Sequence, residues 1–133
     1  MATLEEFNQN CKGLNHVGLS TLDMDATIKF YSLLGFHIAH TKTVKGNKIN
    51  FLRKRNLIIK AYEDKGAIKH EGAIHHITLD VKDIQQAWDY ISKLEYKFLD
   101  NHIKELPFWE KGIRFFSIKG PNEEVIKFCQ INQ

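Results

Sequence analysis

The chain has 133 residues, of which 43% are hydrophobic and 11% aromatic, enough for a single domain with one buried core. Its 19 basic and 16 acidic residues give a formal net charge of +3, without the concentrated basic stripe that nucleic-acid binding requires. No segment approaches the roughly 18 consecutive apolar residues of a membrane span. We therefore expect neither a nucleic acid nor a membrane as a partner.

The N-terminal residues 1–12 are predicted to form an arm ahead of a domain at 13–131. They begin acidic and lack the basic start and apolar core of a signal peptide. The two cysteines, Cys11 and Cys129, lie near opposite ends of the chain and show no CxxC spacing, so neither a zinc knuckle nor a disulfide framework is indicated. A cytoplasmic protein is the expectation.

An internal repeat organises the rest of the chain. Residues 14–21 align with 74–81, so that His16 and His76 occupy equivalent positions 60 residues apart (76 − 16 = 60). The same offset continues through two segments with apolar residues at helical spacing. Asp23 and Asp83 each precede one of these segments and can cap the first turn of a helix.

Three segments rich in β-branched and aromatic residues follow each predicted helix. We expect module one at 13–66 and module two at 73–131, each a strand, a helix and three further strands. Neither module could bury its sheet alone, so the two should share one core. The predicted strands after the helices are 36–43, 47–54 and 56–63 in module one, and 96–102, 112–119 and 123–130 in module two.

Several stretches of both modules match a known signature. They are His16-Val17-Gly18-Leu19, Asp23, Phe30-Tyr31, Leu33-Leu34-Gly35-Phe36, residues 76–83, Gly120-Pro121-Asn122 and Val125-Ile126-Lys127-Phe128. As a set they resemble the vicinal oxygen chelate superfamily of glyoxalases, bleomycin-resistance proteins and dioxygenases, over about residues 13–130. The resemblance implies an α+β fold in which two βαβββ modules form a single cup-shaped half-open barrel, and it favours a homodimer.

Members of that superfamily hold a divalent metal on one residue from the first and last strand of each module, typically His or Gln and Glu. The equivalent positions here are His16, Lys60, His76 and Lys127. A lysine at neutral pH has no free lone pair, and two ammonium groups would repel a dication. We therefore expect no metal and no other cofactor; if a metal is bound, His16 and His76 are its ligands.

The alternation of side chains along a strand describes the surroundings of these lysines. Glu63 lies three residues from Lys60, and Glu124 three residues from Lys127, so both carboxylates should point to the opposite face. Two places remain open for each lysine: the cup itself, or its rim, with the stem covering apolar surface. The same parity places Ile58 and Tyr62 with Lys60, and Val125 and Cys129 with Lys127.

Three functions remain open. The leading hypothesis is a glyoxalase- or bleomycin-resistance-like protein that binds a small, anionic molecule in a metal-free cationic cup, because lysines and imidazoles together bind anions. The alternative is a divalent-metal-dependent enzyme, similar to lactoylglutathione lyase or a ring-cleaving dioxygenase, that completes its coordination differently. The third is catalysis through a lysine whose pKa is lowered by the other. No catalytic residue can be named.

The segment 97–112 is the largest insertion of module two relative to module one. It is expected either to form a lid or wall of the cup, with Phe108 and Trp109 as aromatic surface, or to lie as a loop on the edge of the barrel. The open edges of the two sheets give a physical reason to expect a homodimer.

Overall fold

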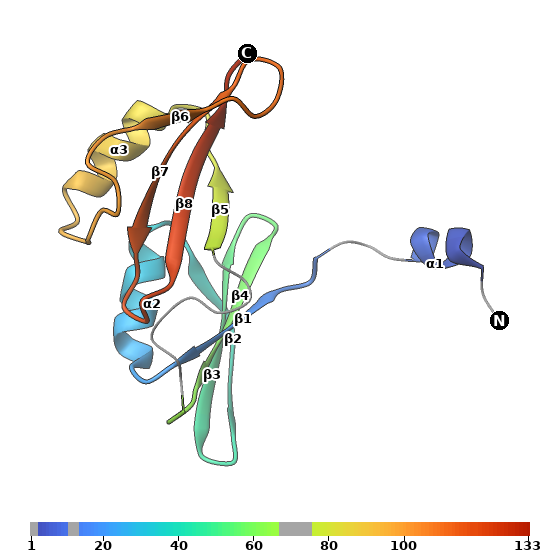
Figure 1. Cartoon of the computed structure of the whole chain (residues 1–133). Coiled ribbons are helices and arrows are strands. Elements are labelled where there is room, and N and C mark those ends of the chain that lie inside the picture. The colour runs from blue at the N-terminus through green and yellow to red at the C-terminus, as the bar shows by residue number, and fades with distance from the viewer. Residues whose placement is uncertain (1–2, 11–13, 67–75) are drawn as a thin grey trace.

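A computed structural model describes residues 3–10, 14–66 and 76–133. Residues 14–66 and 76–133 form two four-stranded sheets with two helices on the same side of them (Figure 1). The sheets have the strand orders β1-β4-β3-β2 and β5-β8-β7-β6 and do not close into a barrel. The predicted α+β fold, two βαβββ modules in a half-open cup, is confirmed. Module one contains β1 (Val17–Thr21), α2 (Met24–Leu33), β2 (His37–Val44), β3 (Asn47–Lys54) and β4 (Leu57–Glu63); module two contains β5 (His76–Asp80), α3 (Ile84–Ser92), β6 (Lys104–Leu106), β7 (Ile113–Lys119) and β8 (Val125–Ile131).

Both helices begin as the sequence predicts. The Asp23 carboxylate accepts a hydrogen bond from the Ala26 amide at 3.0 Å, and the Asp83 carboxylate accepts one from the Gln86 amide at 3.1 Å. These bonds satisfy amides that have no partner within the first helical turn. Gly35 follows α2 with a φ of +95°, a conformation that glycine adopts without steric cost.

One apolar core extends through both modules. On β4 the side chains of Ile59 and Ala61 are buried on the face that α2 covers, and on β8 Ile126 and Phe128 are buried in the same cluster. The ring of Phe30 on α2 meets Tyr96 of module two edge to face, with centroids 4.7 Å apart. Neither sheet therefore has a core of its own, as expected for sheets too small to bury their apolar faces separately.

A polar cluster also joins the modules, between α2 and the turn that connects β7 to β8. The Tyr31 hydroxyl donates to Glu124 Oε2 at 2.9 Å, and Asn122 Nδ2 donates to Thr27 Oγ1 at 2.8 Å. Thr27 donates in turn to the Asp23 carbonyl, so its hydroxyl can accept both from Asn122 and from the Thr21 hydroxyl at 2.9 Å. We call Thr21, Thr27, Tyr31, Asn122 and Glu124 the inter-module clamp. Burial, together with the charge and hydrogen bond of Glu124, raises the pKa of Tyr31 well above its usual value.

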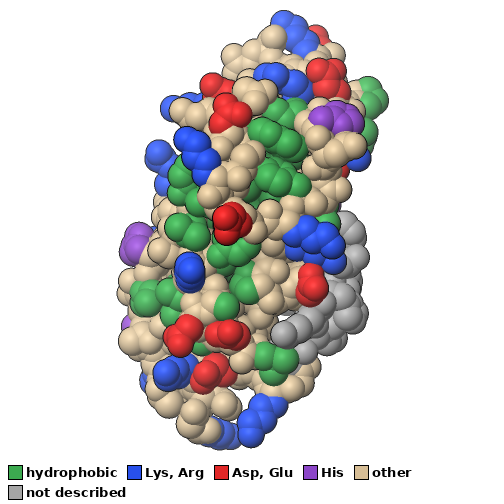
Figure 2. All heavy atoms as spheres, turned by 90° about the vertical axis from the view of Figure 1, so that its left-hand side faces the viewer, with side chains coloured by type: hydrophobic (Ala, Val, Ile, Leu, Met, Phe, Trp, Pro, Cys, Tyr) green, Lys and Arg blue, Asp and Glu red, His purple; other side chains and the backbone are tan. Residues whose placement is uncertain are grey.

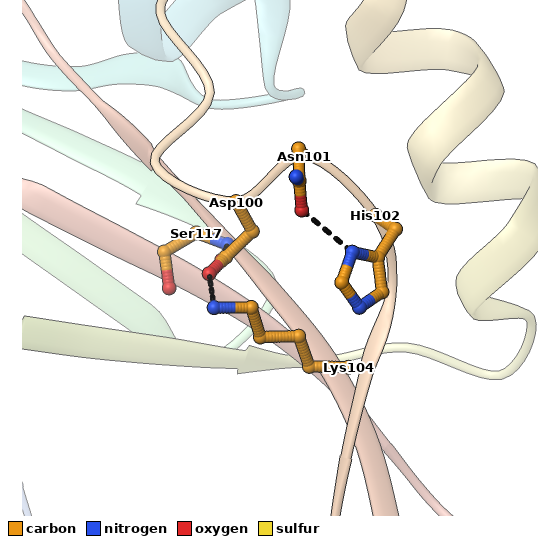
Figure 3. A network of polar contacts seen from close by, with 5 residues as sticks. All are labelled: Asp100, Asn101, His102, Lys104 and Ser117. Carbon is orange, nitrogen blue, oxygen red and sulfur yellow. Dashed lines mark hydrogen bonds and ion pairs between the residues drawn. The ribbon is translucent and has the colours of Figure 1, made fainter.

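The strand predicted at 96–102 is wrong. The regular strand β6 lies further along at Lys104–Leu106, while Leu99 donates one backbone bond to Ser117 and Phe98 forms an isolated bridge with Ile118. The physical reason is the Asp100 side chain. Its carboxylate accepts from the Ser117 amide at 2.7 Å and pairs with Lys104 at 3.1 Å, so a side chain takes the place of a strand carbonyl (Figure 3).

Helix α1 (Leu4–Asn10) was not predicted within the arm at 1–12. It lies apart from both sheets (Figure 1), and the Leu4 side chain is 76% exposed. Within the part of the chain that the structure describes, no helix has the length and apolar character to cross a membrane. The side of the molecule that carries α2 and α3 shows positive and negative side chains interspersed with hydrophobic ones (Figure 2).

Removal of the Tyr31 hydroxyl should weaken the junction of the modules. We expect Tyr31→Phe to lower the free energy of unfolding by about 1–3 kcal/mol, because it removes the donor to a partly buried carboxylate. Urea unfolding measures this. The matched control is Tyr90→Phe. Tyr90 donates to the Leu33 carbonyl across the same junction but is 50% exposed. Water can therefore take the place of its hydroxyl, and the free energy of unfolding should fall by less than in Tyr31→Phe. Equal losses would contradict a role for burial at the clamp.

Candidate functional site

Lys60 lies on the face of the first sheet that points away from its helix. On β4, Ile59 and Ala61 are buried, whereas Ile58, Lys60 and Tyr62 alternate with them and are half-buried. Lys60 pairs with Gly18 of β1 and with Phe51 of β3. Its Nζ lies 6.0 Å from the centroid of the Tyr62 ring, so the ammonium lies above an aromatic side chain of its own sheet.

Two imidazoles lie beside Phe51 on this face. His16, half-buried and placed immediately before β1, meets the Phe51 ring edge to face with centroids 5.8 Å apart, and its Nδ1 lies 2.8 Å from Asn15 Oδ1. His40 lies at the same centroid distance from Phe51. His40 has no partner in the internal repeat and was therefore expected only as a surface or rim residue. The shift in register between Ile38 and His40 brings it opposite Phe51.

Module two repeats the pairing of a lysine with an aromatic ring. Lys127 on β8 is half-buried between Ile126 and Phe128, both buried on the other face. It pairs with Thr78 of β5 and with Ser117 of β7, and its Nζ lies 4.5 Å above the centroid of the Phe115 ring. Phe51 pairs with Lys60, whereas Phe115 pairs with Cys129 and Ser117 pairs with Lys127, so the two phenylalanines do not occupy equivalent places in the two sheets. Neither was among the predicted site residues.

His76 begins β5. Along this strand Ile77 and Leu79 pack against the core, while His76, Thr78 and Asp80 are exposed on the opposite face. This is also the face of Lys127, since Thr78 pairs with it. The four predicted positions therefore form two pairs, His16 with Lys60 on the first sheet and His76 with Lys127 on the second.

Cys129 lies on the same face of β8 as Lys127 and pairs with Asp80 of β5. Burial raises the pKa of the Cys129 thiol, the negative charge of Asp80 raises it further, and the positive charge of Lys127 acts in the opposite direction. The pKa of the Cys129 thiol therefore depends on the charges of both Asp80 and Lys127.

The two carboxylates nearest in sequence to the lysines are engaged elsewhere. Glu63 accepts a hydrogen bond from the Lys48 amide at 2.7 Å, and Glu124 accepts from Asn122 and from Tyr31 in the inter-module clamp. Both observations agree with the parity argument. Among the residues that the structure describes, no three His, Cys, Asp or Glu side chains come close enough together to hold a metal ion.

The insertion 97–112 divides into two parts. Its first part follows the edge of β7, as described above, and its second part forms the loop between β6 and β7. That loop lines a hollow of about 530 Å³ with its own residues, among them Trp109, which is 72% exposed. Trp109 has a φ of +64°, a conformation that bulky side chains rarely adopt.

Comparison with known proteins now decides the family. The sequence model of the Glyoxalase/Bleomycin resistance protein/Dioxygenase superfamily matches residues 13–122, which is most of the chain. The chain belongs to this superfamily. A relative in Bacillus subtilis (strain 168), uncharacterized protein YwbC, is 33% identical over 130 residues, covering 90% of this chain and 98% of YwbC.

Solved structures of the glyoxalase/bleomycin resistance/dioxygenase superfamily share the fold. The glyoxalase family protein from Enterococcus faecalis matches with a TM-score of 0.76 and 14% identity, covering 89% of this chain and 97% of that one. The fosfomycin resistance protein FosX from Listeria monocytogenes, solved with Mn(II) and sulfate, matches with a TM-score of 0.71 and 16% identity, covering 92% and 94%. At these identities the likeness shows the fold alone.

The Cys129 thiol offers a direct probe of the Lys127 charge. In a Cys11→Ser background, Lys127→Gln should raise the pKa of Cys129, because it removes the positive charge that lowers that pKa. The thiolate fraction at a given pH then falls, and alkylation by iodoacetamide slows. Asp80→Asn should shift the pH profile of alkylation the opposite way.

Lys119→Gln is the matched control for that experiment, since Lys119 pairs with Glu123 at the far end of the hairpin. It should leave the pH profile unchanged. A profile that is identical in Lys127→Gln and in the parent protein would show that the ammonium does not lie on the Cys129 face.

Proposed function

We propose that this superfamily member binds a small anionic molecule with a flat apolar part, without a resident metal ion. The observation that carries the proposal is the repeated pairing of a half-buried lysine with an aromatic ring: Lys60 with Tyr62 and Lys127 with Phe115. An ammonium offers charge-assisted hydrogen bonds to a carboxylate or phosphate, and the neighbouring ring offers apolar surface. The imidazoles of His16 and His76 add further donors on the same faces.

The donor set favours an anion over a divalent cation. Two lysines stand at the positions where the resemblance implies carboxylate ligands, and a lysine at neutral pH offers no free lone pair to a metal. Glu63 and Glu124 cannot replace the missing ligands without giving up the hydrogen bonds that they accept elsewhere. The residues of this chain therefore do not fit the metal site of the family.

A metal-dependent lyase or dioxygenase is the second candidate. It draws support from the two retained imidazoles and from FosX, whose structure contains Mn(II). The lysines weigh against it, because they would repel the metal and leave two coordination positions without a ligand.

We further propose that the protein is a cytoplasmic homodimer. The strands β2 and β6 are outer strands of their sheets, and each pairs with a neighbouring strand on one edge. In the N-terminal region the side chains of Leu4 and Leu14 are exposed. A second copy of the chain that covered these edges and apolar side chains would remove surfaces that otherwise promote non-specific association.

Titration with benzoate and its neutral isostere benzamide, followed by backbone amide NMR, tests the proposal. Benzoate should produce saturable shifts at Phe51 and Phe115, next to the two lysines, whereas benzamide should bind at least about tenfold more weakly because it lacks the charge. The double variant Lys60→Gln/Lys127→Gln should lose the preference for benzoate.

Lys48→Gln/Lys111→Gln is the matched control, because it changes the net charge equally at two exposed lysines. It should retain the preference for benzoate. Equal binding of benzoate and benzamide, or an undiminished preference in Lys60→Gln/Lys127→Gln, would refute the anion site.

A further inference from the structure

A second polar hollow lies at the end of the second sheet, where β5 and β8 finish. It has a volume of about 900 Å³, and Asp80, Lys82, Arg114, Gln130 and Asn132 are among its lining residues. Arg114 is half-buried, whereas Lys82 is exposed at the end of β5. None of the four positions His16, Lys60, His76 and Lys127 contributes to this lining.

Arg114 is held in place by two neutral amide side chains. Its Nη2 donates to Gln130 Oε1 at 3.2 Å, and its Nε donates to Asn132 Oδ1 at 3.4 Å. Both amides are themselves oriented: Gln130 Oε1 also accepts from the Ile84 amide at 2.9 Å, and Asn132 Nδ2 donates to the Lys111 carbonyl at 3.0 Å. The guanidinium is therefore positioned before any ligand arrives, which reduces the entropy that binding would cost.

The charge of Arg114 is not balanced within the described chain. In residues 3–10, 14–66 and 76–133, no carboxylate is recorded within ion-pair distance of its guanidinium. The planar guanidinium matches a carboxylate with two parallel hydrogen bonds. The contacts to Gln130 and Asn132 use only part of the five N–H donors of the group.

We infer that this hollow binds a small monocarboxylate through Arg114. The positive side chains of Arg114 and Lys82 belong to residues that line it. A carboxylate bound there would supply the ion-pair partner that the guanidinium lacks within the described chain.

The site is separate from the lysine faces. Arg114 alternates with Phe115 along β7, so its side chain projects to the opposite face of the second sheet from the ring below Lys127. Loss of the Lys60 and Lys127 charges should therefore leave the Arg114 hollow unaffected.

Titration of the protein with acetate, followed by the side-chain NMR signals of Arg114 Nε–H and of the Gln130 and Asn132 amides, tests the inference. Acetate should shift these signals saturably, and Arg114→Gln should weaken acetate binding at least about tenfold. Arg114→Lys keeps the positive charge but lacks the planar guanidinium. It should bind acetate more tightly than Arg114→Gln and more weakly than the parent protein.

The controls separate this site from the proposed one. Lys60→Gln/Lys127→Gln should retain the acetate response at Arg114 even if benzoate binding at Phe51 and Phe115 is lost or was never present. Circular dichroism should show that Arg114→Gln and Arg114→Lys remain folded. Absence of a saturable acetate response at Arg114 in the parent protein, or tighter binding of phosphate than of acetate, would overturn the assignment.

Discussion

The Glu124 carboxylate holds the two modules together by accepting hydrogen bonds from Tyr31 of module one and from Asn122 of its own turn. Asn122 continues the contact to Thr27 on α2. These bonds form where the two halves of the core meet, beside the contact of Phe30 with Tyr96. Because each half depends on the other for burial, the geometry of this junction decides how the two sheets are arranged, and with them the faces that carry His16, Lys60, His76 and Lys127.

The same junction affects the chemistry of the site. Glu124 lies in the turn just before β8, three residues before Lys127, and its hydrogen bond from Tyr31 holds the carboxylate at α2. The resemblance to the superfamily implies glutamates at the positions of Lys60 and Lys127. In this chain the ammonium groups of both lysines lie over aromatic rings instead. Under the function that we propose, these two lysines favour an anion over a divalent cation within an unaltered fold.

Most of the fold could be predicted because the sequence repeats itself. The offset of 60 residues, the caps Asp23 and Asp83, and the alternation along β4 and β8 are local properties that the structure reproduces. What could not be predicted depends on single tertiary contacts. The shift in register between Ile38 and His40 changes the face of β2, and Asp100 replaces a strand carbonyl beside Ser117. Arg114 could not be predicted as a binding residue, because a single arginine in a strand belongs to no recognisable motif.

The metal content of the protein tests the central claim most directly. Elemental analysis of protein purified without chelator, by inductively coupled plasma mass spectrometry, should find nickel, zinc, iron and manganese far below one equivalent per chain. Lys60→Glu/Lys127→Glu, which restores the carboxylates of the family, should bind one of these metals where the parent protein does not. A near-stoichiometric metal in the parent protein, lost in His16→Ala or His76→Ala, would contradict the account.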